Sequence, residues 1–480
     1  PAVGAIIEEP VAVAETRTQV WRVVVSLALT AGAFAALGTA AAAAERLERP
    51  NVIVVLTDDQ PYESLARMPH VNGRSDWIRF ENAFLNNPVC CPSRATLLDG
   101  RYSHRNGVET NFDGRLFDDH DALPVWLKRA GYRTGFFGKY LNGYPWGRKD
   151  GLFVPRGWRR WLAFNRLPSY FNYELNQRGD RQGRADRLSR GSLEKHYSTD
   201  LLARKATRFI DRSARRAKPF FALLSLYAPH GPSVAAPRHE GAFAGSKVEH
   251  PPNFNEDDVS DKPQWIQALQ PTDPEAMAEA RRGQYRQLLA VDDAVRGIFT
   301  SLREARALRE TVVIYLSDNG FLWGEHRDVG KACAYEECIR TPLLIRAPKI
   351  AGRSEGALVS NVDLAPTIAR WAGARLPRFV DGLNLRKLIR GDRDRVRSEV
   401  LLRGRQAPPP NGEGQPPSFW GVRSQRFKYV ETPLTGELEL YDLKNDPFEL
   451  ENVARRAGYA TALDDLDAEL NALRGFEGPP

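Results

Sequence analysis

NVIVVLTDDQ, residues 51–60, is the stretch that decides the fold: a continuous apolar run ends in a polar turn. A run of Val, Ile and Leu without alternation is typical of a strand buried on both faces, as in parallel sheets. Similar runs recur at 132–137, 219–227, 311–316 and 342–345, and helical stretches between them lie at 122–130, 198–213 and 282–308. This alternation predicts a doubly wound α/β domain, with a mainly parallel sheet flanked by helices.

The composition changes after about residue 395. A Pro/Gly-rich loop at 406–417 is followed by short strand-like stretches and a helical one, at 419–423, 427–431, 437–442 and 459–473. We therefore predict a large α/β domain over 46–395. A small C-terminal α+β subdomain over 396–480 would consist of an antiparallel sheet and one helix.

The N-terminal residues 1–45 resemble an export signal. Arg17 and Arg22 precede an uncharged Val/Leu/Ala-rich stretch at 23–44, and polarity returns at Glu45. A basic lead, an apolar core and a small-residue end predict cleavage near Ala44 and a secreted protein. The alternative is an uncleaved membrane anchor, because the stretch is long enough to span a bilayer. Membrane contact is expected only through this segment.

The net charge and the number of cysteines limit which binding partners and which disulfides we expect. The 480 residues carry a formal net charge of +8, which favours anionic substrates or simply a solvated basic surface. No nucleic-acid motif is present, so we do not expect a nucleic-acid partner. Four cysteines are too few for a disulfide scaffold, although Cys333 and Cys338 could bridge locally if the loop geometry allows.

Two of the predicted strands end in oxygen-rich pairs. Asp58-Asp59 follows the strand at 51–56, and Asp318-Asn319 follows the strand at 311–316. Either pair alone is usually a turn former. Ligands bind beyond the carboxyl ends of strands in open parallel sheets, and carboxylates that converge there need a cation among them. Oxygen donors favour Ca²⁺ or Mg²⁺ over zinc, and of the two we expect Ca²⁺.

The second cluster is CCPSRATLLDG, residues 90–100. Pro92 suits a first helical turn and Gly100 a helix end. Cys90 is then expected just before a helix N-terminus, where backbone N–H groups favour an anion. Arg94 is expected to project from the first turn, where a guanidinium can hold an oxyanion.

The C-x-P-S-R sequence at 90–94 resembles the signature of the type I, formylglycine-dependent sulfatases. In that family a formylglycine-generating enzyme oxidises the first cysteine to formylglycine (3-oxoalanine). Further stretches that resemble the family lie at 49–60, 100–108, 133–144, 224–232, 316–331, 362–368 and 440–454. The doubled Cys before PSR, GKYLN and APHGP are most similar to the branch of N-acetylglucosamine-6-sulfatases, heparan endosulfatases and bacterial arylsulfatases. The resemblance implies an alkaline-phosphatase-like fold.

The resemblance also implies roles for single residues. Converted Cys90 would bind the metal together with Asp58, Asp59, Asp318 and Asn319, and the substrate contacts would come from Arg94, Lys139, His230 and Lys331. Lys139 could instead be a solvated surface lysine, and His230 a structural histidine in a turn. His104 is a weaker catalytic candidate, and His326 weaker still, because each lies in a motif yet either could only order a loop. Many family members carry His two residues after the GK lysine; here the residue is Leu141, so the base of the elimination step is unassigned.

The implied activity is hydrolysis of sulfate monoesters, on a sulfated sugar such as glucosamine 6-sulfate and on aryl sulfates. One hydroxyl of the hydrated aldehyde would attack sulfur, and the second would later expel the sulfate. Two alternatives remain. One is a phosphate mono- or diesterase of the same superfamily, and the other is an inactive secreted glycan-binding protein, because a fold does not fix function.

Overall fold

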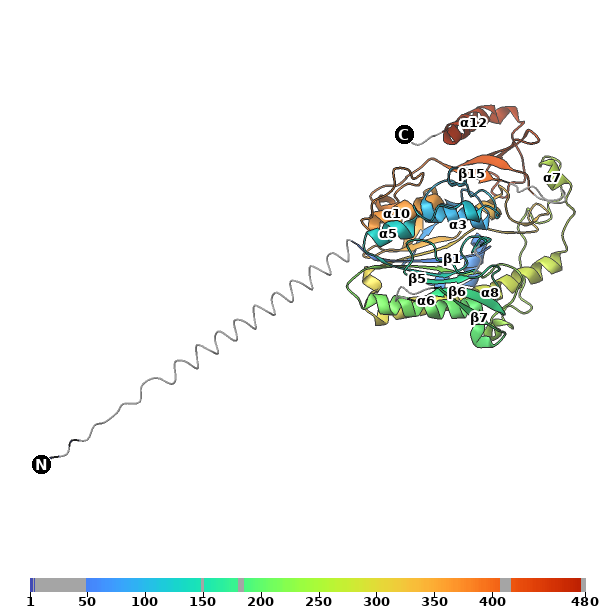
Figure 1. Ribbon diagram of the computed structural model, residues 1–480. Helices are drawn as coiled ribbons and strands as arrows, with labels where there is room; N and C mark the ends of the chain where they lie inside the picture. Colours follow the sequence, from blue (N-terminus) through green and yellow to red (C-terminus); the bar gives the residue numbers. More distant parts are fainter. Residues whose placement is uncertain (3, 5–48, 148–150, 180–184, 406–415, 476–480) are drawn as a thin grey trace. The chain divides into compact units, whose positions relative to one another are not determined.

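The structure is a computed structural model that describes residues 1–2, 4, 49–147, 151–179, 185–405 and 416–475 (Figure 1). The predicted export segment therefore lies almost wholly outside the described residues. Arg49–Pro480 forms one compact unit. Within the described residues, no helix combines the length and the apolar character that a membrane crossing needs.

A ten-stranded sheet forms the centre of this unit. From edge to edge its strands are β13 (Arg353–Glu355), β2 (Ile78–Phe80), β12 (Leu343–Arg346), β9 (Thr311–Ser317), β1 (Asn51–Thr57), β8 (Phe220–Ser225), β4 (Arg133–Gly138), β5 (Arg160–Phe164), β6 (Tyr173–Arg178) and β7 (Asp186–Arg190). The central strands β9, β1, β8, β4 and β5 are parallel. The predicted α/β class and the mainly parallel sheet are confirmed.

The side chains of the apolar run at 51–56 pack on both faces of the sheet, because successive side chains of a strand point to opposite sides. Val52, Val54 and Leu56 join one buried apolar cluster, and Ile53 and Val55 join the other. Both sides are covered, so alternation is absent from the sequence. The sheet is nevertheless mixed: β12 pairs antiparallel with both β9 and β2.

Two layers of helices cover the sheet (Figure 1). The layer with the first apolar cluster contains α3 (Cys90–Asp99), α5 (Leu123–Arg129), α10 (Leu364–Trp371) and α11 (Arg386–Arg390). The layer with the second cluster contains α6 (Ser198–Ala214) and α8 (Pro274–Glu304). Helix α8 begins well before the predicted residue 282, because Pro274 fits its first position and the Asp273 carboxylate accepts hydrogen bonds from the backbone N–H groups of Glu275 and Ala276.

The C-terminal part contains a four-stranded antiparallel sheet and a helix, as predicted. The elements are β15 (Glu399–Gly404), β16 (Phe419–Ser424), β17 (Phe427–Thr432), β18 (Glu437–Asp442) and α12 (Ala460–Gly475). Strand β15 was not predicted. Val400 and Tyr441 of this sheet share a buried cluster with Phe84 and Ile339, so the C-terminal sheet packs against short elements of the large α/β part through apolar side chains. The boundary at residue 396 stays a prediction.

Short elements complete the chain and occur mostly in loops near the carboxyl ends of the strands. They are α2 (Pro69–Asn72), β3 (Ala83–Phe84), α4 (Ser103–Asn106), α7 (Gln264–Gln267), β10 (Leu322–Trp323), β11 (Val329–Gly330), α9 (Glu336–Ile339) and β14 (Val359–Ser360).

Gly138, the last residue of β4, is a position where only glycine fits. Its φ is 129°, and a Cβ there would lie 1.7 Å from the carbonyl oxygen of Ser225. We expect Gly138→Ala to lower the free energy of unfolding by about 2 kcal/mol or more, since both the backbone angle and the clash oppose the methyl group. Urea denaturation followed by circular dichroism measures the loss.

Gly297→Ala is the matched control for that substitution. Gly297 lies inside α8, and a Cβ there would meet nothing within 4 Å. Alanine has the higher helix propensity, so the same assay is expected to show equal or greater stability, by up to about 1 kcal/mol. Equal losses in both variants would contradict the steric argument at Gly138.

Candidate active site

Four polar side chains meet where β1 and β9 end. These neighbouring parallel strands pair as far as Thr57 and Ser317, so the residues that follow emerge side by side. The backbone N–H of Asp59 donates to Asp318 Oδ1 at 3.2 Å, and Asn319 Nδ2 donates to Asp59 Oδ1 at 2.7 Å. The structure thus brings together Asp58, Asp59, Asp318 and Asn319, all of them buried.

Cys90 completes this group from the first turn of α3. Its Sγ lies 3.4 Å from Asp58 Oδ1 and 3.9 Å from Asp59 Oδ1. Two details differ from the sequence prediction. Val89 is the N-cap, so Cys90 is the first residue of the helix rather than the residue before it, and Arg94 consequently lies in the second turn. Gly100 ends the helix in the left-handed conformation, as predicted.

Three cations balance the three buried carboxylates. Lys139 Nζ lies 2.5 Å from Asp58 Oδ2, and Arg94 Nε lies 2.7 Å from Asp318 Oδ2. Lys331 Nζ contacts Asp59 Oδ1 and lies 2.7 Å from Cys90 Sγ. Lys139 is 7 % exposed, so it is not a solvated surface lysine.

The charges in this cluster control the protonation states. Burial alone would raise the pKa of Asp58, but Lys139, Arg94 and His230 together hold that pKa below its ordinary value. Burial likewise opposes ionisation of Asp59, and Lys331 and His230 reverse the effect and lower its pKa. For Cys90, burial dominates and raises the pKa of the thiol. As an unmodified cysteine, Cys90 is therefore a neutral and poor nucleophile.

His230 lies on the loop that follows β8, and its Nε2 is 3.5 Å from Asp59 Oδ2. Nδ1 lies 2.7 Å from the carbonyl oxygen of Gly231, which can only accept, so Nδ1 carries a proton and Nε2 faces the cluster. The imidazole stacks on Tyr227, with ring centroids 4.8 Å apart. The side chain is 31 % exposed, so the cluster is open to solvent on this side.

The cluster offers carboxylate and amide oxygens, the donors that a hard divalent cation prefers, beside one cysteine sulfur and one imidazole nitrogen. One ligand atom from each of Asp58, Asp59, Cys90 and His230 lies within 4.8 Å of the others, which is a possible metal-binding group. The Asn319 Oδ1 is buried and has no hydrogen-bond partner among the described residues. A buried amide oxygen without a partner is costly unless a cation or water satisfies it, so the donor set fits Ca²⁺ or Mg²⁺.

His104 and His326 lie in different surroundings. His104 packs between Tyr102 and Trp420, with ring centroids 5.8 and 5.1 Å away, and burial lowers the pKa of its imidazole to about 4. His326 is fully buried, and its Nδ1 lies 2.7 Å from Glu256 Oε2. Ring packing at His104 and the carboxylate contact at His326 are interactions by which a histidine holds a loop in place. A catalytic role for His104 stays a prediction.

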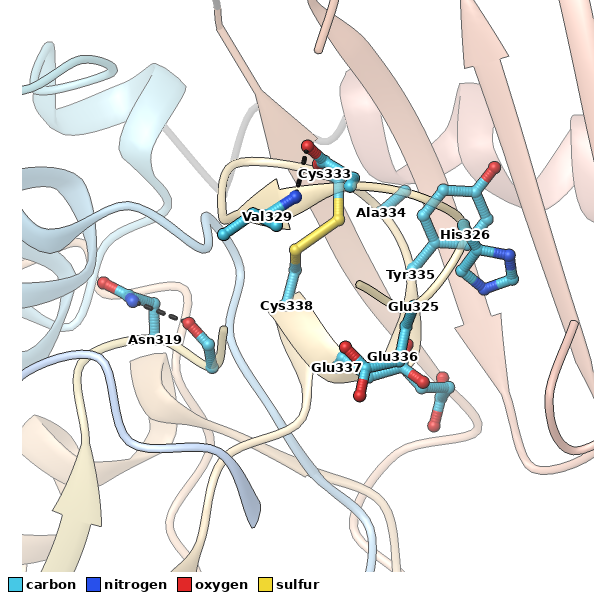
Figure 2. Close-up of a disulfide and its surroundings, with 12 residues drawn as sticks. Asn319, Glu325, His326, Val329, Cys333, Ala334, Tyr335, Glu336, Glu337 and Cys338 are labelled. Carbon is cyan, nitrogen blue, oxygen red and sulfur yellow. Dashed lines mark hydrogen bonds between the residues drawn. A yellow bond between two sulfur atoms is a disulfide. The ribbon is translucent and has the colours of Figure 1, made fainter. Parts of the chain in front are cut away.

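A disulfide joins Cys333 to Cys338 in the loop after Lys331 (Figure 2). The backbone N–H of Gly320 donates to the carbonyl oxygen of Cys338 at 3.0 Å, so the bridged loop contacts the chain directly after Asn319. His326 stacks on Tyr335 of the same loop, with centroids 4.0 Å apart. The bridge therefore ties the segments that carry Lys331 and Asn319 to one another.

Sequence reasoning missed Ser225 and Asn111. Ser225 ends β8 between β1 and β4, accepts from Arg94 at 2.7 Å and donates to the carbonyl oxygen of Lys139 at 2.6 Å. Asn111 accepts a hydrogen bond from the backbone N–H of Cys91 at 3.0 Å and satisfies one free amide of α3. Ser225 is the one hydroxyl-bearing aliphatic side chain inside the run predicted at 219–227, but nothing in the sequence marks its contacts with Arg94 and Lys139.

Family models match most of the chain. The model described as sulfatase covers residues 50–374. A second, described as the C-terminal part of N-sulphoglucosamine sulphohydrolase, covers residues 324–475.

Named relatives agree with these matches. The chain is 30 % identical to human N-acetylglucosamine-6-sulfatase over 90 % of this chain and 85 % of that protein, and 33 % identical to Volvox carteri arylsulfatase over 95 % and 78 %. It is 34 % identical to the Drosophila melanogaster extracellular sulfatase SULF-1 homolog over 72 % of this chain. The chain spans only 32 % of the length of that last relative.

Solved structures show the same fold. A protein in complex with its substrate, D-glucosamine-2-N,6-O-disulfate, superposes with a TM-score of 0.77 at 25 % identity, covering 89 % of this chain and 97 % of that one. A phosphonate monoester hydrolase of Agrobacterium radiobacter superposes with a TM-score of 0.72 at 21 % identity, covering 89 % and 95 %, which shows likeness of fold alone.

The environment of His104 generates a prediction about stability and pH. Its pKa is lower in the folded protein than in the unfolded chain, so between about pH 4 and 6.5 the unfolded state binds the extra proton. Stability from this group is complete above that window and is lost as the pH falls through it. We expect His104→Phe to reduce the loss of unfolding free energy between pH 7.5 and pH 4.5, measured by urea denaturation.

His120→Gln is the control, because His120 lies on the surface with a side chain 63 % exposed. It is expected to keep the wild-type dependence on pH. A His104→Phe profile that runs parallel to the wild type would show that burial does not control this histidine.

Proposed function

The chain belongs to the sulfatase family, and we propose that it hydrolyses the 6-sulfate of glucosamine in a sulfated glycan, using a formylglycine formed from Cys90 and a bound Ca²⁺. One observation carries the proposal. A buried cysteine on a helix N-terminus lies against the carboxylates of two strand ends, and Lys331 contacts its Sγ at 2.7 Å. A plain thiol in that position is inert, whereas an oxidised and hydrated residue 90 would supply a hydroxyl nucleophile that attacks sulfur.

The chain's own cations would act on the sulfate. Lys139 pairs with Asp58 and Lys331 with Asp59, so one lysine lies on each of the two carboxylates next to Cys90. Arg94 pairs with Asp318 and holds it in place. Fixed charges in a buried site stabilise the oxygens of a sulfuryl group without reorganisation, and such preorganisation supplies much of the rate in comparable sites.

His230 is the best-placed acid for the leaving alcohol. The Gly231 carbonyl fixes its Nδ1–H, so it is the imidazolium form that carries a proton on Nε2, which faces the cluster from the solvent side, where the alcohol would depart. Donation of that proton to the leaving oxygen would leave the neutral imidazole with its hydrogen on Nδ1. Proton donation at that position requires Nε2 to be within hydrogen-bond reach of the ester oxygen. Lys331 is the second candidate for the same contact.

The metal would be held by Asp58, Asp59, Asp318 and Asn319 together with residue 90. Carboxylate and amide oxygens suit a hard divalent cation, and Ca²⁺ accepts varied ligand numbers and geometries, whereas Mg²⁺ demands a near-ideal octahedron. When bound, the ion would lower the pKa of the attacking hydroxyl and neutralise sulfate charge.

The substrate class rests on the relatives. Human N-acetylglucosamine-6-sulfatase matches most of the chain, and the structure with D-glucosamine-2-N,6-O-disulfate has the same fold. Aryl sulfates are expected as small substrates because their alcohols leave easily. We also propose that the protein is secreted, in line with the N-terminal segment and the extracellular relative, and that a formylglycine-generating enzyme matures it. Phosphate ester hydrolysis and inactive glycan binding remain the alternatives.

Residue 90 provides the first test. Protein made in a host with formylglycine-generating activity is expected to show the mass of aldehyde or hydrate in the peptide that contains residue 90, and to release sulfate from glucosamine 6-sulfate. Cys90→Ala is expected to lower kcat on an aryl sulfate by at least about 10⁴-fold, because the nucleophile is lost.

Cys91→Ala is the matched control, since Cys91 is the neighbouring buried cysteine and makes no contact with the carboxylates among the contacts described for it. It should keep activity within about tenfold of the wild type. Full turnover by Cys90→Ala would reject the mechanism, and faster hydrolysis of the matching phosphate ester would reassign the reaction.

Metal binding is tested without turnover, in the Cys90→Ala background, which removes the ligand at residue 90 and keeps the four oxygen ligands Asp58, Asp59, Asp318 and Asn319. A ligand that binds only the folded state at a hundred times its Kd stabilises it by about 2.7 kcal/mol, so Ca²⁺ is expected to raise the Tm. Asp59→Asn should abolish most of that rise. Asp211→Asn, at a surface ion pair with Arg215, should leave it intact. An equal rise in all three proteins would place the ion elsewhere.

A further inference from the structure

The solvent face of α6 carries a row of arginines outside the active site. Arg204, Arg208 and Arg212 follow one another at intervals of four residues and are all exposed. Residues four apart lie on one side of a helix, so the three guanidinium groups form a stripe about 12 Å long. Like charges at this spacing destabilise a helix, so the stripe is a cost to folding.

The stripe is wider than the helix. Lys205 lies among Arg204, Arg208, Arg160 of β5 and Arg190 of β7, and burial together with these arginines lowers the pKa of its ammonium group. Five cations from α6, β5 and β7, Lys205 among them, therefore gather in one place. With Arg212 they make a set of six, which we name the cationic stripe: Arg160, Arg190, Arg204, Lys205, Arg208 and Arg212.

The neighbouring acids are already paired with other residues. Arg238 holds Asp200 at 2.6 Å and Asp293 at 2.9 Å, and Arg215 holds Asp211 at 2.9 Å. Within the part of the chain that the structure describes, neither Arg208 nor Arg212 has an ion-pair partner. The guanidinium groups of Arg208 and Arg212 are thus not neutralised by an ion pair within the described residues.

A groove runs beside the stripe between α6 and α8. Two cavities of about 570 and 650 Å³ share Thr207, Arg208, Asp293, Arg296 and Gly297 in their linings, so they form one continuous depression. Small residues such as Ala203, Thr207 and Gly297 line it together with Arg204, Arg208 and Arg296, and the lining also contains Asp200, Asp211, Asp293 and Glu304. Asp200, Asp211 and Asp293 form ion pairs with arginines, so the exposed guanidinium groups along the stripe, rather than the floor of the groove, would contact an anionic chain.

The stripe begins near the candidate active site. Tyr197 precedes α6, donates to the carbonyl oxygen of Val234 and stacks on Tyr170, with centroids 5.6 Å apart. Tyr170 in turn donates to the carbonyl oxygen of His230 at 2.6 Å. At 1.5 Å per residue, Arg204 lies about 9 Å and Arg212 about 21 Å along the helix from Ser198. The stripe thus leads away from the loop that carries His230.

We propose that the cationic stripe and its groove bind a linear sulfated polysaccharide, so that one part of the chain lies on α6 while another reaches residue 90. This inference rests on the proposed function for its substrate class. Guanidinium groups match the oxygens of sulfate groups in paired hydrogen bonds. A polymer with repeated sulfate groups can contact several arginines of the row at once. A monosaccharide substrate is too short to do so.

Binding is measured with a heparin hexasaccharide in the Cys90→Ala background, so that no cleavage is needed. The variant Arg204→Ala/Arg208→Ala/Arg212→Ala keeps good helix formers in α6. Its affinity is expected to fall about tenfold or more, and the slope of log Kd against log salt to fall by about two to three, because fewer counterions are released. Affinity within twofold of the parent protein overturns the proposal.

The matched control is Lys387→Ala/Arg393→Ala/Arg395→Ala, which removes the same formal charge from exposed residues on and after α11, in the other helical layer. It is expected to bind like the parent. Equal losses in both triple variants would mean that net charge alone drives binding, and this also overturns the proposal. So does equally tight binding of single-stranded DNA of equal length and charge.

Turnover separates this inference from the proposed function. In protein with residue 90 converted, the α6 variant should lose about tenfold in kcat/KM on the polysaccharide. It should cleave a small aryl sulfate, which does not reach the stripe, at the wild-type rate. If the wild type does not cleave the aryl sulfate, the proposed function is rejected. If the α6 variant cleaves the aryl sulfate normally and its kcat/KM on the polysaccharide is also unchanged, only the role of the cationic stripe is rejected.

Discussion

The structure depends on the burial of three carboxylates at one edge of a parallel sheet. Asp58, Asp59 and Asp318 would repel one another and resist desolvation if they were left alone. Arg94, Lys139 and Lys331 come from a helix and two different loops to balance them. Each cation fixes a separate segment of the chain, so the electrostatic requirement of the sheet edge also determines how the surrounding loops are arranged.

The same balance explains why the cluster suits a reaction on an anion. Three cations beside three anions leave a cluster near neutrality, and a divalent cation among the carboxylates would make it positive. A sulfate ester then meets a site whose positive groups are already held in position. The disulfide between Cys333 and Cys338 adds rigidity at the point where Lys331 and Asn319 must stay close.

The sequence predicted the parts of this arrangement that depend on local patterns. Strands β1 and β9 are continuous apolar runs, and the residues after them were placed correctly at one sheet edge because parallel neighbours end together. Between residues 144 and 191 the signal was weaker, because β5 is a mostly buried run of only five residues and β6 and the edge strand β7 are polar and only partly buried. Ser225 and Asn111 were missed for a different reason: their importance arises from contacts with residues distant in sequence, and a single sequence does not reveal such pairs.

Because the C-x-P-S-R motif is buried in the folded protein, oxidation of residue 90 and folding have to occur in a fixed order. Cys90 is 1 % exposed, and Ser93 and Arg94 are 2 and 3 % exposed, so a modifying enzyme has no access to the motif once α3 has packed against the sheet. If residue 90 is oxidised, a modifying enzyme therefore has to act on the chain before α3 packs against the sheet. A molecule that folds first keeps the unmodified cysteine for as long as it stays folded.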